Sequence, residues 1–428
     1  MSSTINDFRS IPLLVKIPKG TVAFYRFFDR SDKENKYIFF DEDKLFICYQ
    51  LLRFRYFDFE IAEDVSHSIH GTNLRRWWKS LVGSTHHPLS YERLMKDGRV
   101  KIYYFNKPFV SWLLQTIEDF IQFQELFSIT EKQNSIHSFQ ALGYGGGGPG
   151  RVNEHDLMTR KLTASILKKL GRLLGKDETS RLSLQVSFPV ARNAYYVVPD
   201  STIFIGENRY FIEYDNYTET HSQILSKLIR YVEEEAFYNS MIFFAFKTRN
   251  KNTILSQRVT TFLNYAEKAM LDESLTINAA LLEKGIMVSG IPVSNAAEII
   301  ARNIYLSFCK MSTPHMDKNI LFTSDSSIEN ILSVSKSDLP GVDYLLEYED
   351  DLYMTSYLPI IYLRYGHVGE ETRINEIVSR YSDTYSKFGI VLHDNLTSQH
   401  QQFSDDRVMR RLVYFQLKGE GEKNEKSS

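Results

Sequence analysis

The chain has 428 residues, which is long enough for two or three domains with sizeable hydrophobic cores. Hydrophobic residues make up 43% of it and charged residues 24%, a globular balance that excludes disorder throughout the chain. The formal net charge of −2 excludes a uniformly basic molecule, so any nucleic-acid surface must be a local patch.

Cysteine content and hydropathy predict the compartment. Cys48 and Cys309 are too few and too far apart for a disulfide framework or a zinc motif. No apolar run reaches the roughly 18 residues of a membrane-spanning helix. The first ten residues lack the apolar core of a signal peptide. We therefore expect a cytoplasmic protein without a membrane partner.

Residues 1–44 are predicted to form an N-terminal β segment. Short apolar runs at 11–15, 22–25 and 37–40 are typical of strands, and the polar stretch 29–36 is typical of a loop. No residue here has an evident chemical role.

Residues 45–130 are predicted to form a winged helix-turn-helix domain. Helical periodicity occurs at 45–54, 60–65 and 74–81, and a strand pattern follows at 100–105. In a winged helix-turn-helix, the third helix of such a series enters the major groove of double-stranded DNA.

Cationic residues are concentrated in this third helix and in the wing. Between residues 73 and 107 eight Lys or Arg are opposed by Glu92 and Asp97 alone. Such an excess suits contacts with phosphates. The alternative is a solvated basic face on a domain that binds protein. The predicted contact residues are Arg75, Arg76, Lys79, Arg93, Lys96, Arg99 and Lys101.

Residues 131–152 include a glycine-rich run at 143–150. Backbone N–H groups of such a run can cradle a phosphate, but no Gly-Lys-Ser/Thr follows as in a nucleotide-binding loop. A flexible tether is the favoured interpretation.

Residues 153–275 are predicted to form an α/β core with a mixed sheet. The pattern gives a helix after Asn153, a strand at 182–188, a hairpin at 197–212, a helix after Thr220, an apolar strand at 241–246 and a helix at 259–270.

The hairpin is predicted to align three acids. A two-residue turn at Gly206 and Glu207 places Asp200 directly opposite Glu213, with Cβ atoms roughly 4.5–5.5 Å apart. Asp215 lies on the same face as Glu213 because side chains alternate along a strand. Carboxylates held this close repel one another unless a cation lies between them, and a divalent metal with oxygen ligands suits that position.

The next helix is predicted to carry a lysine to this face. Thr220 and Gln223 have the spacing of a capping box, and Lys227 and Tyr231 lie one turn apart beside the apolar stripe. Lys227 could therefore stabilise charge that develops on a phosphate. The alternative is a hairpin edge with solvated acids and a surface lysine.

A family resemblance rests on these residues. Pro199-Asp200, Glu213-Tyr214-Asp215, Tyr217-Thr218-Glu219, and Lys227 with Tyr231 resemble the replication-relaxation family of bacterial plasmids and mobile elements. The same positions look like a variant of the PD-(D/E)xK nuclease core. The resemblance covers about residues 45–250, and its motifs are short.

The resemblance implies roles for individual residues. In the nuclease core an acid after proline, an acid on the next strand and a lysine two residues later hold metal and phosphate. Asp200 and Glu213 match the acids, but Asp215 stands where the lysine would be. Either Lys227 has taken the role, or the site does not cut. The first helix of the nuclease core often supplies a further acid, here Glu154, although a helix N-terminus favours acids in any case.

The remaining residues carry no motif. Residues 276–417 are predicted to form an α/β extension that binds protein partners or self-associates, and residues 418–428 a disordered tail. Tyr344 to Tyr362 fits either paired strands or a helical hairpin.

Two hypotheses follow. In the first, the protein binds DNA and hydrolyses phosphodiesters with Mg²⁺ or Mn²⁺ held by Asp200, Glu213, Asp215 and Glu154, with Asp200, Glu213 and Lys227 as the catalytic residues. In the second, the nuclease-like core is inert, and the protein is a DNA-binding replication or recruitment factor that needs no metal.

Overall fold

The computed structural model describes residues 17, 20–29, 33–67, 74–83, 86–93, 100–122, 154–175, 184–188, 197–206, 208–217, 219–247, 257–309, 321–323, 328, 330–350, 352–364, 366–392 and 406–417. The chain forms two compact units, Met1–Lys247 with Ala296–Tyr305 and Thr248–Asn295 with Leu306–Ser428. Helices and mixed sheets occur in both, which confirms the predicted α/β (α+β) class. Among the described helices none is long and apolar enough to cross a lipid bilayer.

The N-terminal part of the first unit has the element order of a winged helix. Its elements are β1 (Val22–Asp29), β2 (Glu34–Asp41), α1 (Glu42–Phe54), β3 (Tyr56–Phe57), α2 (Phe59–His67), α3 (Leu74–Leu81), β4 (Leu89–Arg93), β5 (Lys101–Phe105) and α4 (Lys107–Gln122). Strands β3, β5 and β4 form one antiparallel sheet in that order. The sequence predicts the three helices and the wing strand β5, but not β4 or β3. A two-residue strand such as β3 is too short to show periodicity.

Local sequence explains where α1 starts and how α3 is oriented. The Asp41 carboxylate caps α1 by accepting the backbone N–H of Lys44 at 3.0 Å. On α3, Trp77 and Trp78 are buried at 9% and 5% exposure. The helix therefore turns its aromatic side chains inward, and its polar side is left facing solvent.

The second part of the first unit is the α/β core. Its elements are α6 (Glu154–Leu174), β6 (Leu184–Ser187), β7 (Ser201–Ile205), β8 (Asn208–Asp215), α8 (His221–Glu233), the 3-10 turn η1 (Glu235–Phe237) and β9 (Met241–Phe246). Strands β6, β7 and β8 are antiparallel, and β9 joins parallel to β8. Every residue of β9 is buried, as expected of an apolar strand covered on both faces.

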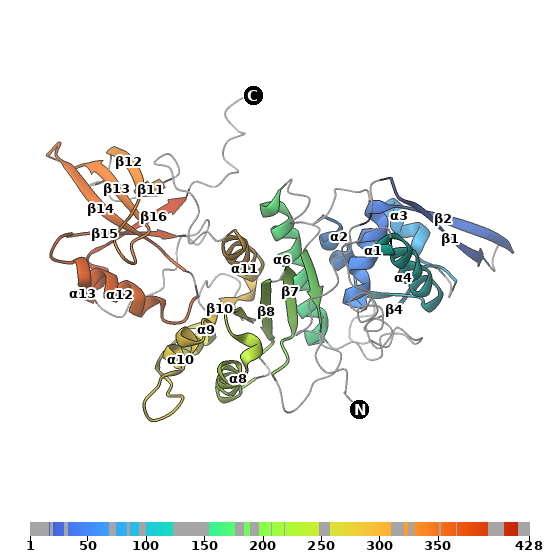
Figure 1. The fold of residues 1–428 in the computed structure, drawn as a ribbon, viewed down its shortest axis with the longest axis horizontal. Coiled ribbons are helices and arrows are strands. Elements are labelled where there is room, and N and C mark those ends of the chain that lie inside the picture. The colour runs from blue at the N-terminus through green and yellow to red at the C-terminus, as the bar shows by residue number, and fades with distance from the viewer. Residues whose placement is uncertain are drawn as a thin grey trace. The chain divides into compact units, whose positions relative to one another are not determined.

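The winged-helix part and the α/β core belong to one unit and share side-chain contacts. Helix α2 packs along α6 (Figure 1). Arg160 on α6 donates to the carbonyl of Phe54 at 2.9 Å and lies over the ring of Tyr56 at 4.1 Å. Lys161 lies 2.7 Å from Asp58. These contacts fix the core against the helices of the winged part.

The second unit is built on a six-stranded sheet with the order β11-β16-β15-β14-β13-β12. Its elements are α9 (Gln257–Lys268), α10 (Ile277–Glu283), β10 (Met287–Pro292), β11 (Leu321–Thr323), β12 (Asn330–Lys336), β13 (Tyr344–Glu349), β14 (Thr355–Tyr362), α12 (Glu370–Tyr381), β15 (Phe388–Leu392), α13 (Asp406–Met409) and β16 (Leu412–Leu417), and the unit holds the ends of α11 (Val293–Phe308). The open question over 344–362 is settled in favour of strands.

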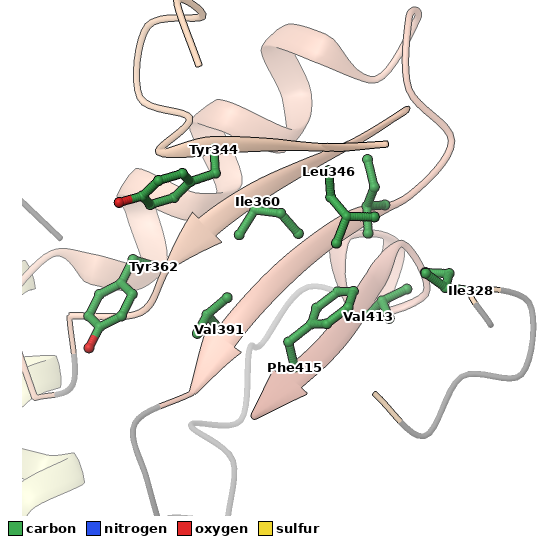
Figure 2. Close-up of a cluster of buried hydrophobic side chains, with 9 residues drawn as sticks. Ile328, Tyr344, Leu346, Ile360, Tyr362, Val391, Val413 and Phe415 are labelled. Atoms are coloured by element: carbon green, nitrogen blue, oxygen red, sulfur yellow. The ribbon is translucent and has the colours of Figure 1, made fainter. Parts of the chain in front are cut away.

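The sheet of the second unit has an apolar core. Figure 2 shows Ile360, Val391 and Phe415, from three neighbouring strands, among the side chains of one buried cluster. The expected end of the nuclease-like core at residue 275 differs from the division between the units, which follows Lys247. The predicted strand at 11–15, the tether at 131–152 and the tail at 418–428 lie outside the described residues.

Candidate functional site: an internally neutralised acid pair

The hairpin has the predicted register. Ser201 pairs with Ile212 and Ile205 pairs with Asn208, so one further step along the ladder sets Asp200 opposite Glu213. Gly206 at the turn has a φ of +57°, a conformation that favours glycine. The sequence therefore predicts correctly which residues face each other across the two strands.

Asp200 lies just before β7, where the strand ladder ends. Its Oδ2 accepts the backbone N–H of Tyr214 at 2.8 Å, so the carboxylate satisfies a donor that has no partner residue on β7. His155 on α6 contacts the same oxygen, with Nε2 at 3.4 Å. The Nε2–H of His155 also donates to the carbonyl of Tyr214 at 2.7 Å. Asp200 thus has a structural role in addition to any chemical one.

Glu213 is buried in the middle of the site, with 2% of its surface exposed. Lys227 on α8 donates to Oε2 at 2.9 Å, and the hydroxyl of Tyr231 donates to Oε1 at 2.5 Å. Both carboxylate oxygens are therefore engaged by α8. Lys227 also lies 2.7 Å from Glu219, which precedes the helix.

The start of α8 explains how the lysine is placed. Thr220 and Gln223 form the predicted capping box, with side chains that bond reciprocally to each other's backbone N–H. Residues 227 and 231 are four apart, so their side chains lie on one face of the helix. That face meets Glu213, as the sequence predicts.

The electrostatics identify which groups carry charge. Burial raises the pKa of Glu213 to about 7, although the charge of Lys227 opposes that rise. The pKa of Lys227 is also raised, because the carboxylates of Glu213, Asp200 and Glu219 outweigh the opposing effect of its own burial. Burial and the neighbouring Glu213 raise the pKa of Tyr231 well above its ordinary value. At neutral pH the lysine therefore stays charged, and the carboxyl is the member of the pair that titrates.

His155 is the second cation of the site. Its interactions with Asp156 and Asp200 raise its pKa to about 10, while burial opposes the shift. Burial on its own would raise the pKa of Asp200, but the hydrogen bond and charge of His155 hold it below its ordinary value. Each acid thus has a protein cation beside it, Asp200 with His155 and Glu213 with Lys227.

The predicted metal set is not assembled. All four expected ligands are described, yet in the described part of the chain no three His, Cys, Asp or Glu side chains are gathered so that they could hold a metal. Glu154 is half exposed and lies 3.9 Å from Lys247. Asp215, two residues after Glu213 on β8, is also buried, but it does not belong to a group of three such side chains. The physical reason is that Lys227 and His155 supply the positive charge that the acids require.

The donor chemistry gives only a partial fit to Mg²⁺. Carboxylate oxygens are the ligands this ion prefers. Both oxygens of Glu213, however, already accept hydrogen bonds from Lys227 and Tyr231. A metal at this position would have to displace one of them, so the residues as arranged do not form a metal site.

The basic residues of the winged part are located as follows. Arg75, Arg76 and Lys79 are exposed on α3, and Arg93 and Lys101 are exposed on the wing strands. Lys96 and Arg99 lie outside the described residues. The side chain of Lys101 lies over the ring of Tyr91 at 4.4 Å.

Sequence reasoning did not identify His155 as a site residue. It is close in sequence to the predicted ligand Glu154, but its partner Tyr214 lies 59 residues away. The only signal in the sequence that could have pointed to His155 is its position between the acids Glu154 and Asp156 at the start of α6.

No family model, curated protein or solved structure matches the chain.

Proposed function

We propose that this protein binds double-stranded DNA through α3 and the β4–β5 wing, and acts as a replication or recruitment factor of the kind found on plasmids and mobile elements. The observation that carries the proposal is the two-sided character of α3. Its tryptophans are buried, whereas Arg75, Arg76 and Lys79 are exposed together on the other side.

The arrangement suits contact with the DNA backbone. A helix that follows two others and precedes a β wing is the element that enters the major groove in winged helix-turn-helix proteins. Exposed Arg and Lys on that helix can neutralise phosphates and release counterions, which gives binding a strong salt dependence. Arg93 and Lys101 extend the cationic surface onto the wing.

The test is a binding titration with a labelled DNA duplex at several salt concentrations. Arg76→Glu should weaken binding and flatten the dependence of log K on log salt concentration, as should Arg75→Glu. Arg172→Glu on α6 changes the charge by the same amount at an exposed position outside the winged part, and should leave binding unchanged. Equal affinity of Arg76→Glu and wild type would contradict the proposal.

Phosphodiester cleavage is a second candidate function. The observation that favours it is the position of Lys227, which donates a hydrogen bond to Glu213. Glu213 faces Asp200 across the hairpin. A lysine that replaced the missing lysine of a nuclease core would lie in this position. In this role Lys227 would offer its positive charge to a phosphate, and Tyr231 would hold Glu213 in place through the hydrogen bond that it donates.

Cleavage is tested by the nicking of supercoiled plasmid with Mg²⁺ or Mn²⁺. Loss of nicking in both Asp200→Ala and Glu213→Ala would support a catalytic site. Equal nicking by both variants and wild type would point to a contaminating nuclease and remove the catalytic role. DNA binding measured on the same preparations distinguishes the loss of the acid pair from the loss of the winged surface.

A further inference from the structure

The hairpin β1–β2 has one face buried and one face open. On the buried face Tyr25 packs against Phe109 at 5.1 Å and Trp112 at 5.3 Å. Phe40 adds contacts with the same two rings. This face is therefore fully used by the winged-helix part of the chain.

The open face carries large apolar side chains. The register sets Phe24 opposite Phe39, and Arg26 opposite Tyr37, on that face. Its exposed apolar residues are Val22 at 49%, Phe24 at 59%, Phe28 at 47%, Tyr37 at 61% and Phe39 at 44%. Arg26 lies over the ring of Tyr37 at 6.0 Å and Lys44 over the ring of Phe39 at 5.1 Å. An exposed apolar surface of this extent on a folded protein marks an interaction site.

The charge around this face argues against a polyanion. Among the described residues 22–44, four cations, namely Arg26, Lys33, Lys36 and Lys44, are opposed by five carboxylates, namely Asp29, Glu34, Asp41, Glu42 and Asp43. Lys36 is paired with Asp29, and Lys44 with Asp41. A nearly neutral rim around an apolar centre suits another protein surface of the same composition.

The area suits a second copy of the same face. Four rings that are each about half exposed offer roughly 100 Å² apiece, and Val22 adds to them. Two such faces together remove about 1,000 Å² from water, which is the lower threshold for a specific interface. Twisted sheets pack face to face with their strands roughly 30° apart, and a two-fold axis lets one patch be its own partner.

We propose that the open face of the β1–β2 hairpin, formed by Val22, Phe24, Phe28, Tyr37 and Phe39, is a dimerisation surface that binds the same face of a second copy of this chain. This inference goes beyond the proposed DNA binding and does not depend on it. In each copy the rings of Phe24 and Phe39 are in contact. The two ring pairs, one from each copy, would form the centre of the interface.

The experiment measures the mass of the full chain by sedimentation over a range of concentrations. Wild type should be a dimer, and the double variant Phe24→Ser with Phe39→Ser should raise the dimer dissociation constant by roughly a hundredfold. The matched control is Leu352→Ser with Tyr353→Ser, which removes two apolar side chains that are 77% and 89% exposed in the second unit. It should remain a dimer.

A cross-link keeps the test decisive if the double variant does not fold. In a Cys309→Ser background, Tyr37→Cys should form a disulfide-linked dimer on oxidation, whereas Tyr353→Cys should not; the other cysteine, Cys48, is buried. A wild type that stays monomeric at about 100 µM overturns the proposal. The proposal is also overturned if the full chain is a monomer and only a variant that lacks residues 1–16 dimerises, because the chain's own N-terminus would then be the partner that covers the face. A monomeric wild type that binds a single-stranded oligonucleotide, with that binding lost in the double variant, overturns it in favour of nucleic acid.

Discussion

The ammonium of Lys227 lies 2.9 Å from Oε2 of Glu213, a carboxyl group that is almost completely buried. The lysine comes from α8 and the acid from β8, so the contact ties the helix to the sheet. It also places a cation where the sequence predicts that one is required. Here that cation belongs to the chain itself.

The first prediction concerns the pH dependence of stability. Burial raises the pKa of Glu213 from an ordinary 4.5 to about 7, so the folded protein holds this proton more tightly than the unfolded chain does. The stability contributed is complete below the unfolded pKa and is lost as the pH rises through the folded one. Between about pH 4.5 and 7, wild type should lose on the order of 2–3 kcal/mol relative to Glu213→Gln. Urea denaturation across this range measures the difference, and parallel curves would contradict the assignment.

The second prediction concerns His155. Asp156 and then Asp200 raise its pKa to about 10, so the ring is charged at neutral pH. Asp200→Asn should lower that pKa, yet leave it above the ordinary 6.5 because Asp156 remains. An NMR titration of the imidazole nitrogens reports the change. Asp64→Asn is the control, because Asp64 pairs with Lys168 instead. An unchanged pKa in Asp200→Asn would show that the 3.4 Å contact with Asp200 carries no weight.

The third prediction tests the packing of the second unit. Gly389 lies on β15, and a Cβ placed there would come within 2.3 Å of Ile360 and 2.7 Å of the Phe415 ring. Gly389→Ala should therefore destabilise the second unit by about 1–3 kcal/mol through overpacking. Thermal unfolding measures the loss. The companion change Ile360→Val in the same chain shortens the side chain and should recover part of it.

Much of the candidate site follows from short-range patterns in the sequence. A turn at Gly206 fixes the pairing of Asp200 with Glu213, because register in a hairpin follows from the position of the turn. The Thr220 capping box fixes the start of α8 and therefore the side on which Lys227 projects. These features depend on neighbours within about 15 residues, and the structure has them as predicted.

The features that sequence reasoning missed depend on long-range contacts. His155 reaches Asp200 from a helix that begins far earlier in the chain, and no periodic pattern encodes such a meeting. The predicted metal ligands are not gathered into one group in the described part of the chain. Spacing shows that acids share a face, but not that protein cations lie beside them. Arg160, which joins the core to Phe54, is likewise an interior residue of α6 with no distinguishing motif.

The fourth prediction concerns the start of α8. The Thr220 hydroxyl accepts the backbone N–H of Gln223 at 3.3 Å and closes the capping box. Thr220→Ala should cost about 1 kcal/mol of stability, because an N–H at the helix end loses its acceptor. Thr220→Ser keeps a hydroxyl and should cost a few tenths at most. Denaturant titration compares the two variants, and equal losses would show that the box contributes nothing.

The last prediction separates the fold of α3 from its surface chemistry. Trp78 and Lys79 are adjacent, yet Trp78 is 5% exposed and packs against Phe57, Phe59 and Tyr103, whereas Lys79 is exposed. Trp78→Ala should lower the free energy of unfolding by about 3–5 kcal/mol, since a large buried ring leaves a cavity. Lys79→Ala should change it by less than about 0.5 kcal/mol. Its effect should appear instead as weaker DNA binding with a smaller salt slope. A stable Trp78→Ala protein would place the tryptophan outside the core, and unchanged DNA binding by Lys79→Ala would remove that lysine from the proposed contact surface.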